Sequence, residues 1–237
     1  MFFGLFWGDW TIFLLIPAMM FALWAQFRVQ STFHKYDKVL SSSNMTGAEA
    51  ARRILDKNGI YDVRVERISG HLSDHFDPRT KVIRLSDSTY GSNSVAAIGV
   101  AAHEAGHAVQ YATGYAPIRL RQAIVPMTRF GSALAMPLFL IGLLLVGFGA
   151  INPTVGEYMM FGGIVLFSLS TIFQLITLPV EFNASKRAIL AIKNENLTTE
   201  TVSGVRKVLT AAAMTYVTAM LITLANLMRF LVRSRRR

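Results

Sequence analysis

The pentapeptide His103-Glu104-Ala105-Gly106-His107 places two imidazoles and a carboxylate at the spacing of a catalytic zinc site. On an α-helix, residues four apart lie on the same face, so both histidines can direct a ring nitrogen at one ion. Glu104 would then lie beside a metal-bound water and could take its proton. The small residues Ala105 and Gly106 leave room between the two ligands. The pattern therefore predicts zinc held by His103 and His107, with Glu104 as the base.

Two histidines leave such a site incomplete, because catalytic zinc usually takes three protein ligands and keeps one position for water. The chain has no cysteine, so the third ligand must be His, Asp or Glu. Glu181 is one candidate, because it lies at the end of an apolar segment, where a carboxylate is costly unless it is paired, solvated or bound to a cation. His71 and His75, in a polar loop, are rivals. Spacing alone does not choose among the three.

The composition is that of a membrane protein: 52% of the residues are hydrophobic, 16% are charged, and the mean hydropathy is +0.40. Four stretches without charge are long enough to cross a bilayer. They are 10–27, 130–156, 158–180 and 208–228. The N-terminus lacks the basic leader and cleavage site of a secretory signal, so the first stretch is expected to stay as an anchor.

The residues between the first two stretches differ in character and hold all five histidines. Thr46 and Glu49 have capping-box spacing, and Gly59 is placed to end the helix that they begin. The expected elements are this helix to about 58, strands at 63–68 and 81–85, and a metal helix from about 93 to 113. The edge of strand 81–85 could hold an extended peptide near zinc, or the strand could be an ordinary part of a small sheet.

These segments predict five parts of the chain. They are an N-terminal transmembrane anchor at 1–27, an extramembrane domain with the metal helix at 28–130, a transmembrane hairpin at 131–180, a helical extension carrying the third-ligand candidate at 181–207, and a last transmembrane helix with a basic tail at 208–237.

The chain resembles the YugP-like membrane-bound neutral zinc metallopeptidases, which are related in logic to the HtpX and Ste24 integral-membrane zinc proteases. The resemblance covers most of the chain and rests on 73–82, 100–110, 115–121, 178–182 and 208–213. It implies a mainly α membrane protein with about four transmembrane helices and a small α+β, zincin-like extramembrane domain with a short sheet. It also implies that His103, His107 and Glu181 bind zinc, in the manner of a gluzincin, and that Glu104 is the general base.

Two roles stay open at this point. HtpX and Ste24 proteases have an aspartate four residues after the ligand glutamate, where this chain has Ser185. Orientation of the histidines would then fall to Asn183, Ser185 or backbone carbonyls. The oxyanion stabiliser is unassigned, and the candidates are His75, Tyr115 and Arg119.

The function expected from these features is an integral-membrane zinc metalloendopeptidase that cleaves membrane-associated or juxtamembrane substrates. The alternative is a zinc-stabilised membrane scaffold or adaptor without turnover, which would not need Glu104. A transporter is a weaker hypothesis, because the spans lack internal charges and show no inverted repeat. The net charge of +10 does not indicate nucleic-acid binding, since no basic stripe with interleaved aromatics is present.

The cations also predict topology. With four spans, the loop after the first span and the segment 181–207 fall on one side and carry nineteen of the twenty-four Lys and Arg, whereas the short loop around Glu157 carries none. The catalytic site is therefore expected on the cytoplasmic face of the cell membrane, although five arginines crowd the C-terminus on the other side. The expected partners are a peptide or membrane-protein substrate and the lipid bilayer, with a homo-oligomer or a membrane partner protein left open.

Overall fold

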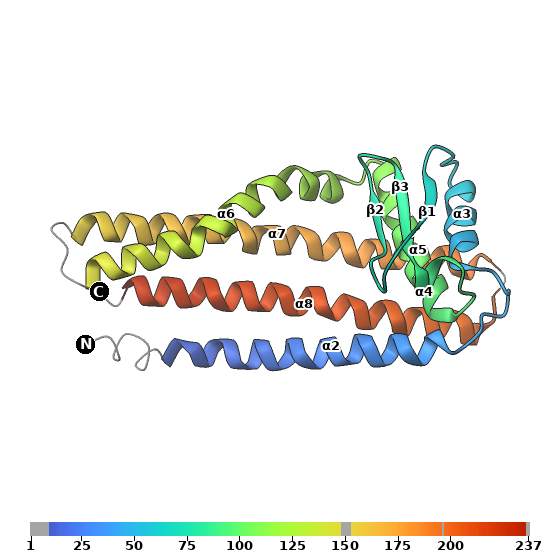
Figure 1. The fold of residues 1–237 in the computed structure, drawn as a ribbon, viewed down its shortest axis with the longest axis horizontal. Coiled ribbons are helices and arrows are strands. Elements are labelled where there is room, and N and C mark those ends of the chain that lie inside the picture. The colour runs from blue at the N-terminus through green and yellow to red at the C-terminus, as the bar shows by residue number, and fades with distance from the viewer. Residues whose placement is uncertain (1–9, 148–152, 196, 236–237) are drawn as a thin grey trace. The chain divides into compact units, whose positions relative to one another are not determined.

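The computed structural model describes residues 10–147, 153–195 and 197–235, and helices make up most of them. The elements in chain order are the 3-10 helix η1 (Trp10–Leu14), α2 (Leu15–Asp37), α3 (Gly47–Lys57), β1 (Arg64–Ile68), β2 (His75–Asp77), β3 (Val82–Ser86), α4 (Asp87–Tyr90), α5 (Val95–Ala112), α6 (Ala116–Gly147), α7 (Pro153–Lys193) and α8 (Thr199–Arg235) (Figure 1).

Four of the described helices are long and apolar enough to cross a membrane. Their candidate spans are Thr11–Asp37, Ala116–Gly147, Thr154–Lys193 and Thr199–Ser234. Together with the three-stranded sheet they confirm the predicted class, a mainly α membrane protein with a small sheet. The helices continue past the uncharged stretches, so that α7 runs without a break from its apolar part through Glu181 to Lys193.

The predicted loop around Glu157 is wrong. Glu157 lies inside α7, which begins at Pro153, a residue that suits the first turn of a helix because the N–H it lacks would be unpaired there. A single charge in a long apolar region does not by itself mark a turn, whereas a proline at 153 marks the start of the helix. The connection from α6 to α7 falls at 148–152, outside the described residues.

Contacts divide the chain into two compact units, and the five segments predicted from the sequence stay a prediction. One unit comprises 120–178 with the described parts of 1–23 and 216–237. Its α6 and α7 approach closely, since a Cβ on Gly142 would lie 2.5 Å from the carbonyl oxygen of Gly156. Small residues allow such backbone contact between membrane helices. Its core is Phe139, Leu143, Met160, Ile164 and Phe230.

The other unit comprises 24–119 and 179–215 and holds the sheet and α3 to α5. Helix α3 begins with the predicted capping box: the Thr46 N–H donates to Glu49 Oε2 at 2.8 Å, and the Glu49 N–H donates to Thr46 Oγ1 at 3.3 Å. The Thr46 hydrogen bonds hold the pKa of Glu49 below its ordinary value. The apolar face of α3 buries Ile54 and Leu55 in the core that also contains α5.

The sheet has the strand order β1-β3-β2, with β1 parallel and β2 antiparallel to β3. Both predicted strands are confirmed as β1 and β3, and β2 was not predicted. Because β3 is central and paired on both sides, the prediction that a peptide docks on the edge of strand 81–85 is wrong. The outer edges of the sheet belong to β1 and β2.

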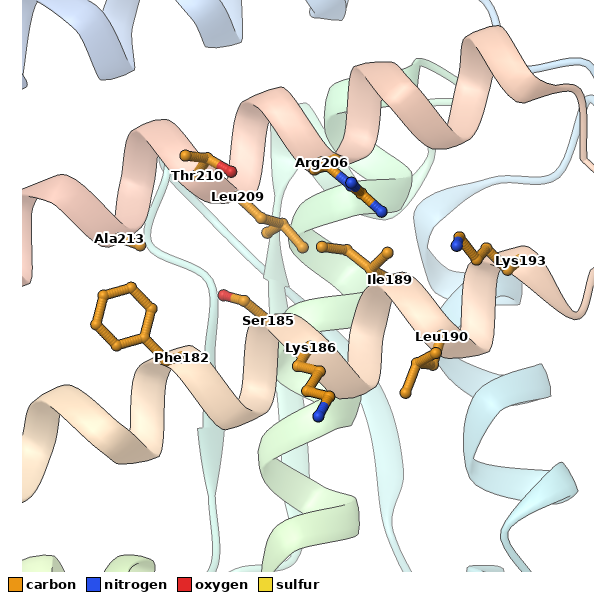
Figure 2. A pocket seen from close by; sticks show the side chains of 10 residues that line it. All are labelled: Phe182, Ser185, Lys186, Ile189, Leu190, Lys193, Arg206, Leu209, Thr210 and Ala213. Atoms are coloured by element: carbon orange, nitrogen blue, oxygen red, sulfur yellow. The ribbon is translucent and has the colours of Figure 1, made fainter.

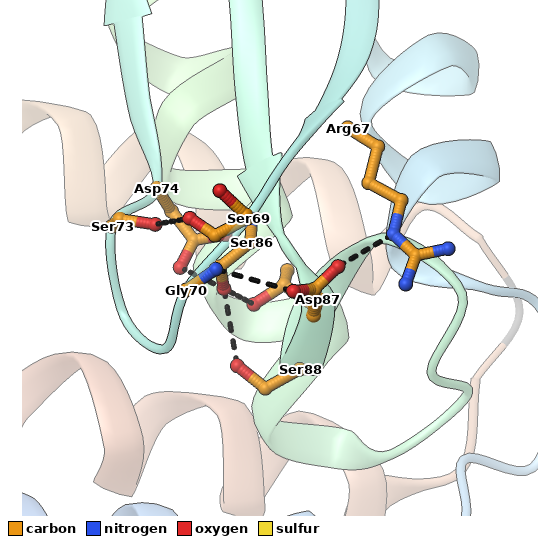
Figure 3. Close-up of polar contacts among 9 residues, drawn as sticks. Arg67, Ser69, Gly70, Ser73, Asp74, Ser86, Asp87 and Ser88 are labelled. Carbon is orange, nitrogen blue, oxygen red and sulfur yellow. Dashed lines mark hydrogen bonds and ion pairs between the residues drawn. The ribbon is translucent and has the colours of Figure 1, made fainter.

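Two aspartates fasten the loop between β1 and β2 to the end of β3 (Figure 3). Asp74 accepts hydrogen bonds from the N–H and the hydroxyl of Ser86, at 2.8 and 2.9 Å. Asp87 pairs with Arg67 at 2.6 Å and accepts from the N–H of Gly70 at 3.2 Å. The Arg67 contact holds the pKa of Asp87 below its ordinary value. The loop is thus fixed where the chain turns into α4.

Candidate metal centre

Helix α5 presents His103 and His107 on one face, as their spacing predicts. Ser94 caps its start by accepting from the N–H of Ala97 at 3.1 Å, and Gly114, with φ of +68°, follows its end. The imidazoles meet edge to face, with centroids 4.7 Å apart. The helix is buried along most of its length, and its alanines and glycines allow close packing from several sides.

The third group at this face is Glu181 on α7. Its Oε2 lies 3.1 Å from His103 Nε2 and 3.5 Å from His107 Nε2, and one ligand atom from each of the three residues lies within 4.8 Å of the others. Ligand atoms at about 2.1 Å from a tetrahedral ion are about 3.4 Å apart, so these separations fit one zinc ion. Glu181 is 1% exposed, and a carboxylate so deeply buried needs positive charge or hydrogen bonds around it.

The two helices that carry these groups touch backbone to backbone. A Cβ built on Gly106 would lie 2.7 Å from the carbonyl oxygen of Ala184. A larger residue at 106 would push α7 away from α5, and Glu181 with it. The absence of a side chain at Gly106 therefore brings the donors of α5 and α7 within reach of one another.

The far nitrogen of each histidine also has a partner. Nδ1 of His103 lies 3.2 Å from Ser185 Oγ, and Nδ1 of His107 lies 3.0 Å from Gln110 Oε1. Such contacts fix the ring orientation of a metal-ligating histidine. Of the orienting groups weighed from the sequence, Ser185 touches His103 directly. Asn183 reaches His107 only through Gln110, which sequence reasoning missed.

Gln110 is fully buried, and its amide orientation follows from its neighbours. Arg187 can only donate, so the Asn183 atom that it contacts at 2.8 Å is the acceptor Oδ1. The Gln110 nitrogen donates to that oxygen at 3.0 Å and to the carbonyl of Val180 at 2.8 Å. Its oxygen therefore faces His107 and accepts from Nδ1–H. In the neutral ring this leaves the Nε2 lone pair of His107 pointing toward Glu181.

The rival histidines lie elsewhere. His71 packs edge-on against Phe33 with ring centroids 5.3 Å apart, and His75 Nδ1 lies 2.8 Å from the carbonyl oxygen of Ser73. Within the described parts of the chain, His103, His107 and Glu181 form the one group of three potential metal-ligating side chains. Of the oxyanion candidates, His75 lies on β2, and the ring of Tyr115 faces Arg187 at 5.9 Å.

Glu104 is buried on α5, 9% exposed, next to His103 in sequence. Burial by itself would lower the pKa of His107, but its hydrogen bond to Glu181 and the charges of Glu104 and Glu181 raise that pKa above its ordinary value. The negative charges of Glu104 and Glu181 thus act on His107, and they favour a cation beside it.

A hollow of about 410 Å³ lies between α7 and α8 near this group (Figure 2). Ser185, one of its lining residues, contacts Nδ1 of His103, on the ring edge opposite the Nε2 that faces Glu181. The hollow therefore adjoins Ser185, and His103, His107 and Glu181 are not among its lining residues. Its lining is Phe182, Ser185, Lys186, Ile189, Leu190, Lys193, Arg206, Leu209, Thr210 and Ala213.

Comparison with known proteins decides what kind of site this is. The model of the family described as "Putative neutral zinc metallopeptidase" matches residues 11–235. The chain belongs to this family. It is 51% identical over 222 residues to the "Putative membrane protease YugP" of Bacillus subtilis (strain 168), an alignment that covers 93% of this chain and 95% of that protein. No solved structure matches the chain. Membership of a zinc metallopeptidase family identifies zinc as the metal that the cluster suits.

Proposed function

We propose that this zinc metallopeptidase is an integral-membrane endopeptidase of the gluzincin type, which hydrolyses peptide bonds in membrane-associated or juxtamembrane substrates. The observation that carries the proposal is the convergence of His103 Nε2, His107 Nε2 and Glu181 Oε2. The first two belong to the pentapeptide on α5, and the third comes from a helix that contains a candidate membrane span. The substrate class follows from that junction.

His103, His107 and Glu181 would hold the zinc ion. When bound, zinc polarises a carbonyl oxygen and lowers the pKa of a coordinated water toward neutrality. Ser185 and Gln110 would hold the two imidazoles in orientation through their Nδ1 atoms.

Glu104 would act as the general base. It follows His103 directly on α5 and is buried, and its negative charge raises the pKa of His107, which supports a role for its carboxylate beside the proposed zinc ligands. It would take a proton from the attacking water and return that proton to the leaving amine. A positioned base of this kind contributes about 10²–10⁴-fold to a rate.

The outer edge of β2 is the place where we expect the substrate backbone to bind. Tyr111 lies one turn beyond His107 on the same face of α5, and its ring meets Phe76 of β2 with centroids 6.1 Å apart. This edge strand is therefore beside the histidine face of the metal helix. An extended peptide can add to such an edge through main-chain hydrogen bonds.

The charge distribution supports a site on the cytoplasmic side. Most Lys and Arg lie in the segments 28–129 and 181–207, which also hold the candidate site. Reporter fusions within the loop before α5 and at the C-terminus test this orientation. A loop reporter active only outside the cytoplasm would contradict it.

A zinc-stabilised scaffold is the competing function, and Glu104 separates the two. In purified full-length protein, Glu104→Gln is expected to keep zinc at wild-type stoichiometry while cleavage of fluorescently labelled casein falls by about 10²-fold or more. Glu66→Gln, in an exposed pair with Arg64, is the control and should keep the wild-type rate. Cleavage by Glu104→Gln at the wild-type rate would refute the general base. Zinc-loaded wild type without cleavage of any peptide library would favour the scaffold.

A further inference from the structure

A second cavity, of about 580 Å³, lies between α2 and α8 within the unit formed by 24–119 and 179–215. The helices are in contact there, since Phe33 and Tyr36 of α2 pack with Val208 of α8. This groove, called the α2–α8 groove below, plays no part in the proposed hydrolysis. It is lined by Trp24, Arg28, Thr32, Lys35, Tyr36, Arg206, Lys207, Thr210, Ala211 and Met214.

The groove lies where both helices change from charged to apolar sequence. On α2 the uncharged stretch ends at Phe27, and Arg28 is the first cation after it. On α8 the order is reversed: Lys207 is the last cation before the uncharged stretch that begins at Val208. Trp24 lies on the apolar side, and tryptophan is typical of the membrane interface. The groove therefore lies where the headgroup region of a bilayer is expected to meet its hydrocarbon.

Four cations gather on the polar side of this groove, and no acidic residue is among its described lining residues. None of them takes part in an ion pair between described residues. Two of them lie over aromatic rings instead, Arg28 over Trp24 at 5.6 Å and Lys35 over Tyr36 at 5.7 Å. Their mutual repulsion is relieved most directly by an anion. The other two of the four cations are Arg206 and Lys207.

We infer that the α2–α8 groove binds an anionic phospholipid of the surrounding bilayer, with its phosphate among the four cations and an acyl chain against Trp24, Ala211 and Met214. The lining is cationic in one part and apolar in the other, and this division favours a phospholipid, which has an anionic and an apolar part. A free phosphate would leave the apolar half unfilled, and a zwitterionic lipid would not compensate the charge. Basic pockets between membrane helices bind anionic headgroups in this way.

The test uses Trp24 as the fluorescent probe, in the full-length protein with Trp7→Phe and Trp10→Phe, since the chain has three tryptophans. The protein is placed in nanodiscs of phosphatidylcholine that contain a small fraction of phosphatidylglycerol with brominated chains. Brominated phosphatidylglycerol is expected to quench Trp24 at a much lower mole fraction than brominated phosphatidylcholine. The measurement needs no substrate, so it is independent of hydrolysis.

Charge removal sharpens the test. Each cation contributes about 1 kcal/mol near an anionic headgroup, so Arg28→Gln with Lys207→Gln should raise the half-quenching fraction about thirtyfold. Lys186→Gln with Lys193→Gln is the matched control: it removes the same charge from α7 and should change the fraction little. Arg28→Lys with Lys207→Arg keeps the charge and should keep the preference, which separates loss of binding from loss of fold.

Three results would overturn the inference. Equal quenching by the two brominated lipids would show that the groove does not select a headgroup charge. Equal effects of the α7 control and the groove variant would reduce the preference to net charge. Relief of quenching by inorganic phosphate, but not by chloride at matched ionic strength, would make the groove a site for free anions.

Discussion

His107 Nδ1 lies 3.0 Å from Gln110 Oε1, and that contact is the last in a chain of hydrogen bonds that begins at Arg187. Because Arg187 can only donate, the Asn183 atom that it contacts is the acceptor Oδ1. The Gln110 nitrogen donates to that oxygen, and the Gln110 oxygen is then left to accept from His107 Nδ1–H. A guanidinium on α7 thereby determines which nitrogen of a histidine on α5 is free to bind a cation.

Replacing Gln110 tests this relay. Gln110→Leu removes the acceptor for His107 Nδ1–H and is expected to weaken zinc binding by about 10–100-fold, measured by competition with a chromogenic chelator. Gln110→Glu restores the acceptor and should recover part of the affinity, although it loses the donations to the Val180 carbonyl and to Asn183 Oδ1. If Gln110→Leu released zinc at the same chelator concentration as the wild type, Gln110 would have no role in zinc binding.

Replacing Glu181 tests the third ligand. Glu181→Gln keeps the shape but loses the charge, and we expect the zinc content after dialysis to fall well below one per chain. Glu195→Gln is a matched control, because Glu195 is also a nearly buried carboxylate, paired with Lys57 at 2.6 Å. It should lower thermal stability and leave zinc in place. Full zinc occupancy in Glu181→Gln would mean that another residue is the third zinc ligand.

Two glycines of α5 give a paired test of helix approach. Gly106→Ala puts a methyl group 2.7 Å from the Ala184 carbonyl oxygen, so we expect a loss of about 1–3 kcal/mol in stability together with weaker zinc binding. A Cβ added in Gly99→Ala meets Val205 at ordinary van der Waals distance, with Cγ1 nearest at 3.5 Å, and alanine favours helix by up to about 1 kcal/mol. It should be neutral or stabilising. Thermal midpoints in detergent and chelator titrations measure both effects, and equal behaviour of the two variants would deny the close approach any special role.

Removing zinc should loosen the two helices that share it. A ligand present at about 1,000 times its Kd adds about 4 kcal/mol of stability, so chelation is expected to lower the thermal midpoint. Hydrogen exchange should then speed up around His103 and His107 on α5 and around Glu181 on α7. The Glu181→Gln variant is the control, since its midpoint should not respond to zinc. An unchanged midpoint in the wild type would mean that bound zinc contributes nothing to the fold.

The parts of the fold that local chemistry determines could be predicted. The capping box at Thr46 and Glu49, the helix around His103 and the strand at 82–86 each depend on neighbours within a few positions. Strand β2 could not, because three residues are too few for alternation and the Asp77-Pro78 turn signal adjoins them. Phe76 pairs with Ile83 only once the chain has folded back.

The site shows the same limit. The pentapeptide specifies two donors through the helix repeat, whereas Gln110 carries no signal until the Val180 carbonyl and Asn183 of α7 are placed beside it. Buried amides of this kind resemble any helical glutamine in sequence. Spacing in the sequence could not choose among the candidates for the third ligand. In the folded protein Glu181 lies beside the histidines, whereas His71 packs against Phe33.

The separation of the donors along the chain also has a consequence during biosynthesis. His103 and Glu181 are 78 positions apart. At about 5–20 residues per second, the ribosome needs roughly 4–16 s to add the glutamate after the histidine. With the proposed ligand set, the nascent protein lacks the third ligand throughout that interval, and zinc-dependent hydrolysis is expected only once Glu181 of α7 has been synthesised. The order of synthesis would thus delay the proposed cleavage until the last ligand has been added to the chain.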